Sequence, residues 1–288
     1  MSRPPFLVTK ESKSTQNGKN ISRKGAKDAK KILRHGLVLN QKDIDSRFPL
    51  RTLRALRETP FLFRLVRVKF IITMRISLIG MSGSGKSLWS GKLSDHGFKR
   101  FCCDEMIASR LSHELRKQDG TTMDLGEWMG IPYEKNYASR ESQYLTCERQ
   151  VVTEIVGRLR NGDGPGKNIV VDTTGSVIYA GDDIVSDLRR LTTFVYFPVP
   201  PEVRAQMLKQ YVAAPRPVLW RELFSKHPGE TNEQALARCY PDLLRSRETL
   251  YQRYADVSID YYQRHQEGFG VEEFLHDIIA SGPAKRNG

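Results

Sequence analysis

The residues best suited to chemistry form a glycine-rich segment, Gly80-Met81-Ser82-Gly83-Ser84-Gly85-Lys86-Ser87, which satisfies the pattern G-x-x-x-x-G-K-[ST]. Such glycines let backbone N–H groups turn inward around phosphates, and a helix starting there adds the positive end of its dipole. Lys86 is suited to bridge the β- and γ-phosphates of ATP, and Ser87 to ligate Mg²⁺. The expected nucleotide-binding residues are Gly80, Ser82, Gly83, Ser84, Gly85, Lys86 and Ser87.

The segments on either side of this motif are those that a phosphate-binding loop (P-loop) requires. Residues 75–79 are a short apolar run typical of a buried strand, and residues 88–96 are expected to continue as a helix. Because both flanks and all motif positions match, a glycine-rich turn that binds nothing is the less favoured alternative.

Strand-like and helix-like segments alternate after the motif, which is typical of a doubly wound parallel sheet. The expected strands are 99–102, 168–172, 192–197 and 256–260, and the expected helices are 105–117, 140–160, 182–190, 202–212, 231–254 and 271–279. Thr231 and Gln234 form the capping box that opens the longest C-terminal helix. We predict an α/β fold, a three-layer doubly wound parallel five-stranded sheet with a P-loop and a lid, as one domain over residues 74–280.

Several features together resemble the shikimate kinase family over nearly all of residues 74–260. They are the P-loop, Asp104 at the end of the next strand, Arg216-Pro217-Val218-Leu219, and Arg247-Glu248-Thr249-Leu250-Tyr251 followed by Ala255-Asp256-Val257. The P-loop is common to a superfamily that includes the nucleoside monophosphate kinases, whereas the later segments are more specific. The resemblance implies a kinase that uses ATP and Mg²⁺ to phosphorylate a hydroxyl of a small metabolite. Shikimate, an intermediate of aromatic amino acid biosynthesis, is the leading acceptor.

The resemblance also implies roles for individual residues. Asp104 would hold the acceptor hydroxyl and could deprotonate it, and Arg216 would reach the ATP phosphates from a mobile lid. Arg247 would hold the carboxylate of the acceptor, and Gly175 would let the backbone of its turn approach the acceptor. Lys86, Asp104 and Arg216 are therefore the expected catalytic residues, and Asp104, Gly175 and Arg247 the expected substrate-binding residues.

Each side chain also has a structural interpretation that the sequence leaves open. Asp104 could cap the helix that follows it, and Arg216 could be an exposed loop charge. Arg247 could pair with Glu248 or Asp242 on a solvated helix face.

The chain departs from the family pattern at the expected metal site. Shikimate kinases usually carry Asp-x-Asp after the second strand, whereas this chain has Cys102-Cys103-Asp104, so the carboxylate that supports the metal is missing. Asp172 ends an apolar strand as a Walker-B-type carboxylate would, and could supply an oxygen ligand directly or through water. The expected metal ligands are Ser87 and Asp172, although Asp172 could instead cap a turn.

The acceptor side departs from the pattern as well. The family's Gly-Gly-Gly turn appears as Thr173-Thr174-Gly175-Ser176, and its arginine before Glu148 is replaced by Leu145, with Arg140 or Arg149 as possible substitutes. The insertion 118–139 could form a lid, a pocket wall or a packed surface flap. These changes favour a kinase of the same fold for a sugar acid or nucleoside monophosphate. Cys102 in place of a carboxylate favours another alternative, a regulatory nucleotide-binding protein with weakened catalysis.

The basic charge lies almost entirely before the predicted domain. Residues 1–73 hold 18 of the 46 Lys and Arg and five of the 33 Asp and Glu, which leaves 28 of each for the rest. We expect residues 1–35 to be disordered. Residues 48–72 could be a transit-like segment, a docking helix or translated sequence upstream of a start at Met74. The neutral domain is not expected to bind nucleic acid, although an NTPase using the basic arm is a third alternative.

The remaining composition excludes several kinds of site. The four cysteines form no CxxC pair and the six histidines no HExxH motif, so we expect reduced thiols and no structural zinc. The longest apolar stretch, 61–79, is interrupted by Arg64, Arg67, Lys69 and Arg75 and is too charged to span a bilayer. We expect a cytoplasmic monomer that acts on a small-molecule acceptor and does not bind membranes.

Overall fold

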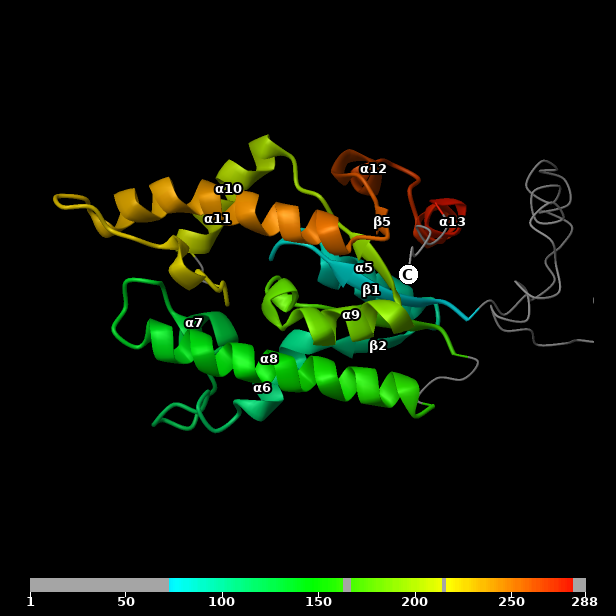
Figure 1. The fold of residues 1–288 in the computed structure, drawn as a ribbon, viewed down its shortest axis with the longest axis horizontal. Coiled ribbons are helices and arrows are strands. Elements are labelled where there is room, and N and C mark those ends of the chain that lie inside the picture. Colours follow the sequence, from blue (N-terminus) through cyan, green and yellow to red (C-terminus); the bar gives the residue numbers. More distant parts are fainter. Residues whose placement is uncertain (1–72, 163–166, 214–215, 282–288) are drawn as a thin grey trace, which may run out of the picture. The chain divides into compact units, whose positions relative to one another are not determined.

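A computed structural model describes residues 73–162, 167–213 and 216–281 of the chain (Figure 1). The chain divides into two units at Met74, and all the strands and helices of the described residues belong to the second unit. The basic segment 1–73, which we expect to be partly disordered, lies outside the described residues apart from Thr73.

A five-stranded parallel sheet lies at the centre of the second unit. Its strands, in the spatial order β2-β3-β1-β4-β5, are β1 (Arg75–Ile79), β2 (Lys99–Cys102), β3 (Ile169–Asp172), β4 (Thr193–Tyr196) and β5 (Val257–Ser258). All four strand pairings are parallel, which confirms the predicted sheet. After β1 the chain forms β2 and β3 on one side of β1, and later β4 and β5 on its other side. The carboxyl end of β1 is therefore a topological switch point, where sheets of this class bind ligands.

Helices of three to 24 residues connect these strands and cover the sheet. They are α5 (Lys86–Asp95), α6 (Cys103–Arg110), α7 (Leu125–Met129), α8 (Tyr137–Arg160), α9 (Asp182–Leu191), α10 (Pro201–Ala213), α11 (Asn232–Tyr254), α12 (Tyr261–His265) and α13 (Val271–Ser281), with 3-10 turns η1 (Val177–Tyr179) and η2 (Arg221–Leu223). The predicted capping box at the start of α11 is confirmed, because Thr231 and Gln234 each accept from the other's backbone N–H.

The two faces of the sheet carry separate apolar cores. Alternation along β1 directs Ile76 and Leu78 to one face, where they join Trp89 of α5 and Phe274 of α13. Ile79 belongs to the core on the other face, which α8, α9 and α11 cover. The result is the predicted three-layer arrangement, and it places α8 and α11 beside the carboxyl end of the sheet.

The helix predicted for residues 105–117 is wrong in its bounds, because α6 ends at Arg110. After α6 the chain turns back on itself, and the backbone N–H of Lys117 donates to the carbonyl of Thr121 at 2.8 Å. Gly120 has a φ of 83°, a conformation that glycine adopts without strain. This turn uses backbone groups that a longer helix would need.

The insertion 118–139 is packed against the domain rather than extended into solvent. The side chain of Asp124 accepts from the backbone N–H of Glu127 at 2.8 Å and caps α7, a helix that the sequence did not predict. Trp128 and Met129 on α7 are buried in the same core as α8. Of the three interpretations open from the sequence, the structure favours a packed surface flap.

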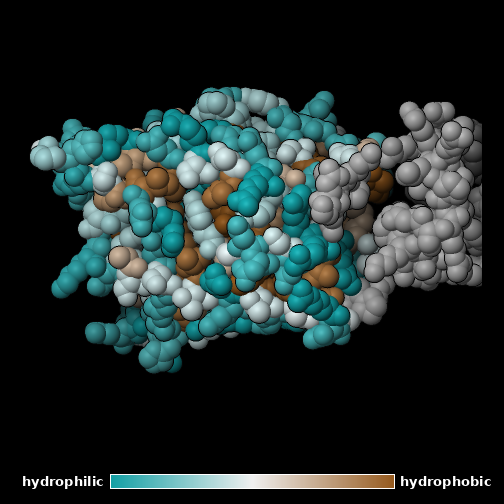
Figure 2. All heavy atoms as spheres, viewed as in Figure 1, coloured by the Kyte–Doolittle hydropathy of each residue, from teal (hydrophilic) through white to brown (hydrophobic). Residues whose placement is uncertain are grey.

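The surface seen in Figure 2 is mostly hydrophilic over the described residues, with hydrophobic residues in separate patches between them. This distribution agrees with the burial of the large apolar side chains in the two cores. None of the described helices is long and apolar enough to cross a membrane.

Candidate active site

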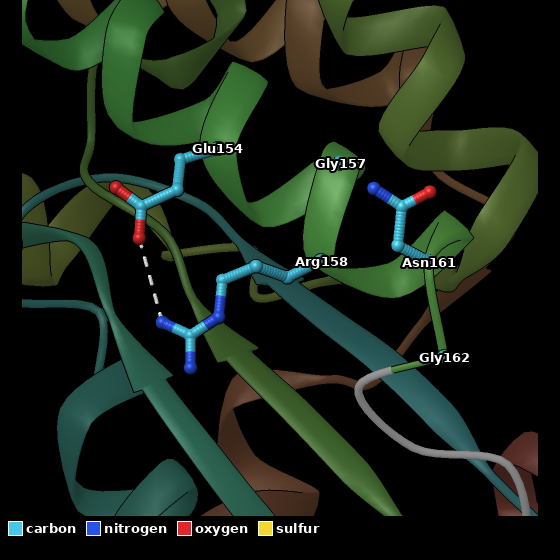
Figure 3. A pocket seen from close by; sticks show the side chains of 5 residues that line it. All are labelled: Glu154, Gly157, Arg158, Asn161 and Gly162. Atoms are coloured by element: carbon cyan, nitrogen blue, oxygen red, sulfur yellow. Dashed lines mark hydrogen bonds and ion pairs between the residues drawn. The ribbon is translucent and has the colours of Figure 1, made fainter.

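One hollow on the surface of the described residues lies away from the P-loop, and a smaller cavity adjoins it. The first is open and is lined by residues at the end of α8, namely Glu154, Gly157, Arg158, Asn161 and Gly162 (Figure 3). Arg75, the first residue of β1, donates to the carbonyl of Leu159 in this part of α8. This hollow therefore lies at the amino end of the sheet, whereas ligands of parallel α/β sheets bind at the carboxyl end.

The P-loop joins the end of β1 to the start of α5, and Lys86 is already the first residue of that helix. Gly80 has a φ of 145°, and a Cβ there would lie 2.9 Å from the carbonyl oxygen of Phe197. Neither the conformation nor the space suits another residue type. Glycine is therefore the residue type that fits this position of the loop.

Lys86 lies across the mouth of this loop. Its Nζ donates to the carbonyls of Gly80 at 2.8 Å and Met81 at 2.9 Å. Burial lowers the pKa of Lys86 to about 8, while the negative charges of Asp172 and Asp104 oppose that shift. The amine is held where a phosphate could replace the two carbonyls as its partner.

Asp104 lies in the first turn of α6 at the edge of the site, where the residue as a whole is exposed but its carboxyl group is largely surrounded by protein. The N-cap position of α6 is Cys102, so Asp104 does not cap the helix. The hydroxyl of Tyr144 donates to Oδ1 of Asp104 at 3.1 Å. Desolvation by the surrounding protein raises the pKa of Asp104, and the charge of Lys86 opposes the shift. A carboxylate with a raised pKa is suited to accept a proton.

Asp172 ends β3 directly beside Cys102 in the β2–β3 ladder, so it lies next to the position where the family carries a carboxylate. It is buried, and its Oδ2 accepts from Nη2 of Arg100 at 2.9 Å and from Oγ of Ser90 at 2.8 Å. Burial raises the pKa of the Cys102 thiol to about 11, which keeps it protonated and a poor ligand for a hard cation.

These oxygen donors fit Mg²⁺ with one restriction. Ser87 is exposed in the first turn of α5, and its hydroxyl is a hard donor of the kind that Mg²⁺ prefers. Oδ2 of Asp172 already forms an ion pair with Arg100. Asp172 is therefore better suited to accept a hydrogen bond from a metal-bound water than to bind the metal directly. Among the described residues no group of three or more His, Cys, Asp or Glu could hold a metal ion by itself.

The turn after β3 touches both the P-loop and α11. A Cβ on Gly175 would lie 2.9 Å from the backbone nitrogen of Ser82, so only glycine fits without a shift of the loop. The carbonyl of Gly175 accepts from Nη1 of Arg247 at 3.3 Å and from the hydroxyl of Tyr251. Arg247 is 2% exposed, which excludes the solvated helix face considered from the sequence.

Glu148 is a buried member of the site that was not among the predicted site residues. It projects from α8, and its Oε1 accepts from Oγ of Ser176 at 2.8 Å and from the hydroxyl of Thr174. Its Oε2 is buried with no hydrogen-bond partner among the described residues. Burial raises the pKa of Glu148 to about 7. The hydroxyls of Thr174, which replaces a family glycine, and of Ser176 thus hold the turn to α8.

Arg216 reaches the P-loop from the lid segment, residues 216–221. Its Nη1 is 3.7 Å from the position that a Cβ on Gly83 would occupy. A small cavity lies between the two elements and is lined by Ser82, Gly83, Met207, Gln210, Tyr211, Arg216, Val218 and Tyr240. The guanidinium of Arg216 is therefore next to the backbone of the P-loop.

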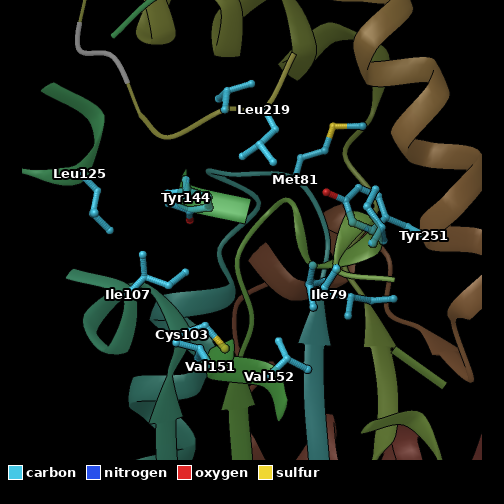
Figure 4. Packing of buried hydrophobic residues seen from close by; sticks show 14 of the residues in the cluster. Ile79, Met81, Cys103, Ile107, Leu125, Tyr144, Val151, Val152, Leu219 and Tyr251 are labelled. Carbon is cyan, nitrogen blue, oxygen red and sulfur yellow. The ribbon is translucent and has the colours of Figure 1, made fainter. Parts of the chain in front are cut away.

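The rest of the lid segment is packed into the domain. The hydroxyl of Tyr137 donates to the carbonyl of Val218 at 2.7 Å and accepts from the backbone N–H of Trp220 at 2.9 Å. Arg247 donates to the carbonyl of Leu219 at 2.6 Å. Figure 4 shows Leu219 in the same apolar cluster as Met81 of the P-loop and Tyr251 of α11.

The two arginines that could replace the family residue at Leu145 make other contacts. The guanidinium of Arg140 faces the ring of Trp128, with 5.9 Å to the ring centre. Nη1 of Arg149 lies 2.7 Å from the position of a Cβ on Gly181. Neither contact places a guanidinium beside Arg247.

Comparisons with known proteins show that the fold of this chain is similar to that of solved shikimate kinases. No protein-family model matches the chain, and no curated protein sequence matches it. A solved structure of shikimate kinase from Acinetobacter baumannii in complex with shikimate is 21% identical, with a TM-score of 0.48 and coverage of 74% of this chain and 96% of that chain. Shikimate kinase from Bacteroides thetaiotaomicron is 19% identical, with a TM-score of 0.42 and coverage of 72% and 93%. At these values the similarity is to the fold alone.

Proposed function

We propose that this chain is a shikimate kinase-like enzyme that transfers the γ-phosphoryl group of ATP to a hydroxyl of a small metabolite, with shikimate the leading acceptor. The observation that best supports the proposal is the convergence of charges on Lys86. Besides burial, four charged residues from separate segments shift the pKa of Lys86. Asp172 and Asp104 raise this pKa, and Arg247 and Arg216 lower it. Clusters of mutually interacting ionisable groups in a cleft are typical of functional sites.

The proposed reaction is a direct displacement at phosphorus. The acceptor oxygen forms a bond to the γ-phosphorus while the bond to the oxygen shared with the β-phosphate breaks, which releases ADP. The hydroxyl proton passes to the carboxylate of Asp104, the acid at the edge of the site. Tyr144 holds the other side of this carboxylate through Oδ1 and so fixes its orientation.

Positive groups of this chain would stabilise the charge on the transferring phosphoryl group. Lys86 would exchange its two carbonyl partners for phosphate oxygens, and Arg216 would contribute from the lid. Mg²⁺ bound with ATP supplies further charge neutralisation, and Ser87 would hold it, with Asp172 acting through a bound water.

Two alternatives have a specific observation in their favour. Thr173 and Thr174 place side chains where the family has glycines, and Thr174 is bonded to the buried Glu148, which favours a kinase of the same fold for a sugar acid or a nucleoside monophosphate. The ion pair of Arg100 with Asp172, together with the protonated Cys102, favours a regulatory nucleotide-binding protein with weakened catalysis.

The experiment that separates these functions is a coupled assay of ADP release by the full chain with Mg·ATP. The acceptors are shikimate, gluconate and nucleoside monophosphates, each compared with no acceptor. Lys86→Ala is the blank, and Lys92→Ala on the same helix is the matched control. Acceptor-dependent ADP release supports a kinase and identifies its acceptor, whereas ATP binding without it supports the regulatory alternative.

We further propose that the protein acts as a cytoplasmic monomer on a small-molecule acceptor and that the domain binds no nucleic acid. The equal number of acidic and basic residues after residue 73 supports the last point. Gel filtration tests the oligomeric state. Salt-sensitive DNA or RNA binding that persists without residues 1–73 would contradict the absence of a nucleic-acid site.

A further inference from the structure

A single buried hydroxyl holds the backbone of the lid segment, residues 216–221, at two places. The hydroxyl of Tyr137 donates to the carbonyl of Val218 at 2.7 Å and accepts from the backbone N–H of Trp220 at 2.9 Å. Tyr137 is the first residue of α8 and is 4% exposed, and Val218 and Trp220 are buried as well. Loss of this hydroxyl would leave a buried carbonyl and a buried N–H without this partner, which is costly. The contact therefore fixes the backbone between the two lid residues.

Two other side chains bind the neighbouring backbone groups of the lid. Nη2 of Arg247 donates to the carbonyl of Leu219 at 2.6 Å. Oε1 of Glu141, on the same helix as Tyr137, accepts from the backbone N–H of Arg221 at 2.8 Å. Consecutive lid residues thus each have a backbone group bound by a side chain of α8 or α11. All the partners belong to the chain itself, so these bonds do not require a ligand.

The side chain of Trp220 adds an anchor in the core. It is fully buried, and its Nε1 donates to the hydroxyl of Tyr211 on α10 at 3.0 Å. Its ring centre lies 5.9 Å from that of Tyr240 on α11. Movement of this end of the lid would therefore break contacts with three helices at once.

Arg216 lies two residues before this anchored backbone, and the residue between them is Pro217. A proline ring fixes its own φ and disfavours the helical conformation of the residue before it, so the chain from Val218 back to Arg216 has few conformations available. Nη1 of Arg216 lies 3.7 Å from the position of a Cβ on Gly83. Both Arg216 and Val218 line the small cavity against the P-loop. The place of the Arg216 guanidinium therefore depends on where Val218 is held.

We infer that Tyr137 is a positioning residue for nucleotide binding: by fixing the backbone that follows Pro217, it holds Arg216 at the P-loop. The inference rests on the proposed function for the role of Arg216 at the phosphates of ATP. A guanidinium that the fold already holds in place loses less conformational freedom on binding a phosphate, so the affinity is higher. The packed surface flap, residues 118–139, thus supports the lid through Tyr137.

A double-mutant cycle tests the inference on the affinity of the full chain for a non-hydrolysable Mg·ATP analogue, measured by calorimetry. Tyr137→Phe keeps the ring in the core and removes only the hydroxyl, whereas Arg216→Ala removes the guanidinium. We expect each change alone to raise the Kd about fivefold or more, and Tyr137→Phe to change it less than about twofold when Arg216→Ala is already present. A purely structural role of Tyr137 would not depend on Arg216 in this way.

Tyr254→Phe is the matched control. Tyr254 is also a buried tyrosine on a long helix, and its hydroxyl donates to Asp182 of α9, outside the lid segment. This change also removes a hydrogen bond but should leave the Kd unchanged. The inference is wrong if either Tyr137→Phe or Arg216→Ala alone leaves the Kd unchanged, or if Tyr137→Phe raises it equally with and without the guanidinium.

Hydrogen exchange of the lid backbone is a second measurement, and its first part needs no variant. The backbone N–H groups of Trp220 and Arg221 donate to side chains of α8, so peptides covering residues 218–221 should be protected in the wild type without nucleotide. The ATP analogue should change this protection little, and Tyr137→Phe should exchange faster. Protection that arises only when the analogue is added would contradict the inference.

An assay of ADP release on the same preparations separates this inference from the proposed function. The predicted cycle, without ADP release by the wild type with any acceptor, would support the role of Tyr137 and contradict the kinase. Acceptor-dependent ADP release, with a Kd that does not respond to Tyr137→Phe, would support the kinase and contradict the role of Tyr137.

Discussion

The guanidinium of Arg100 donates from Nη2 to Oδ2 of Asp172 at 2.9 Å and so joins β2 to the end of β3 beside the P-loop helix. The Nε of the same guanidinium donates to Oγ of Ser90 at 2.8 Å, and Ser90 in turn donates to Asp172. One buried carboxylate is thus held by residues from two elements, and α5 is fixed relative to the sheet.

Removal of Arg100 should destabilise the fold because it leaves the buried Asp172 with only the Ser90 hydroxyl. We expect Arg100→Ala to lower the free energy of unfolding by about 2 kcal/mol, less than the ~3–5 kcal/mol lost when a fully buried pair loses one partner. The smaller value follows from the 27% exposure of Arg100. Urea denaturation measures the change, with the exposed Arg245→Ala as control. Equal stability of the two variants would show that Asp172 does not depend on Arg100.

The protein should take up a proton at Lys86 when it binds ATP above about pH 8. Burial lowers the pKa of Lys86 to about 8, so part of the free protein has a neutral amine at that pH. Phosphate charges favour the protonated form and raise this pKa, so affinity should fall as the pH rises above it. Calorimetry at about pH 8.5 in two buffers of different ionisation enthalpy measures the uptake. Lys86→Met should abolish it, and identical heats for the wild type in both buffers would contradict the prediction.

Glu148 should make the fold less stable as the pH rises. Burial raises its pKa from 4.5 to about 7, so between these values the folded protein binds a proton that the unfolded chain has released. The free energy of unfolding should therefore decrease over this range, on the order of 3 kcal/mol for this group alone. Glu148→Gln, which stays neutral, should gain stability relative to the wild type between about pH 5 and pH 8. Chemical denaturation at both values tests this, and a difference independent of pH would contradict it.

Gly175→Ala should impair nucleotide binding, because the added Cβ would lie 2.9 Å from the backbone nitrogen of Ser82. The P-loop must then move, and we expect the Kd for ATP to rise about tenfold or more, equivalent to ~1.4 kcal/mol. Gly157→Ala on α8 is the matched control, since its Cβ meets no atom within 4 Å. That control should stabilise the helix by ~0.5–1 kcal/mol and leave ATP binding unchanged. Titration of ATP against both variants measures the difference.

The fold and the nucleotide-binding loop could be predicted because their signals are local. Residues 80–87 specify the loop by their types and spacing, and the apolar runs and capping residues specify the elements around it. The end of α6 was harder to predict. The helical pattern of the sequence continues toward Lys117, whereas the turn at Gly120 competes with it in the structure.

The acceptor side could be predicted only in part, because its contacts join residues distant in sequence. The bond between Glu148 and Ser176 and the pair of Arg100 with Asp172 depend on how α8 and the strands pack, and no local pattern indicates them. A polar residue on the buried face of α8 was the one available signal for Glu148.

Transfer of the γ-phosphoryl group itself tests the central claim most directly, and phosphorus NMR can follow it in the full chain with Mg·ATP and each acceptor of the panel. We predict a new phosphate-ester resonance that grows as ATP is consumed with the wild type and with Lys92→Ala, and that does not appear with Lys86→Ala. Formation of inorganic phosphate alone, or the same ester signal with Lys86→Ala, would contradict the proposal that this chain is a small-molecule kinase.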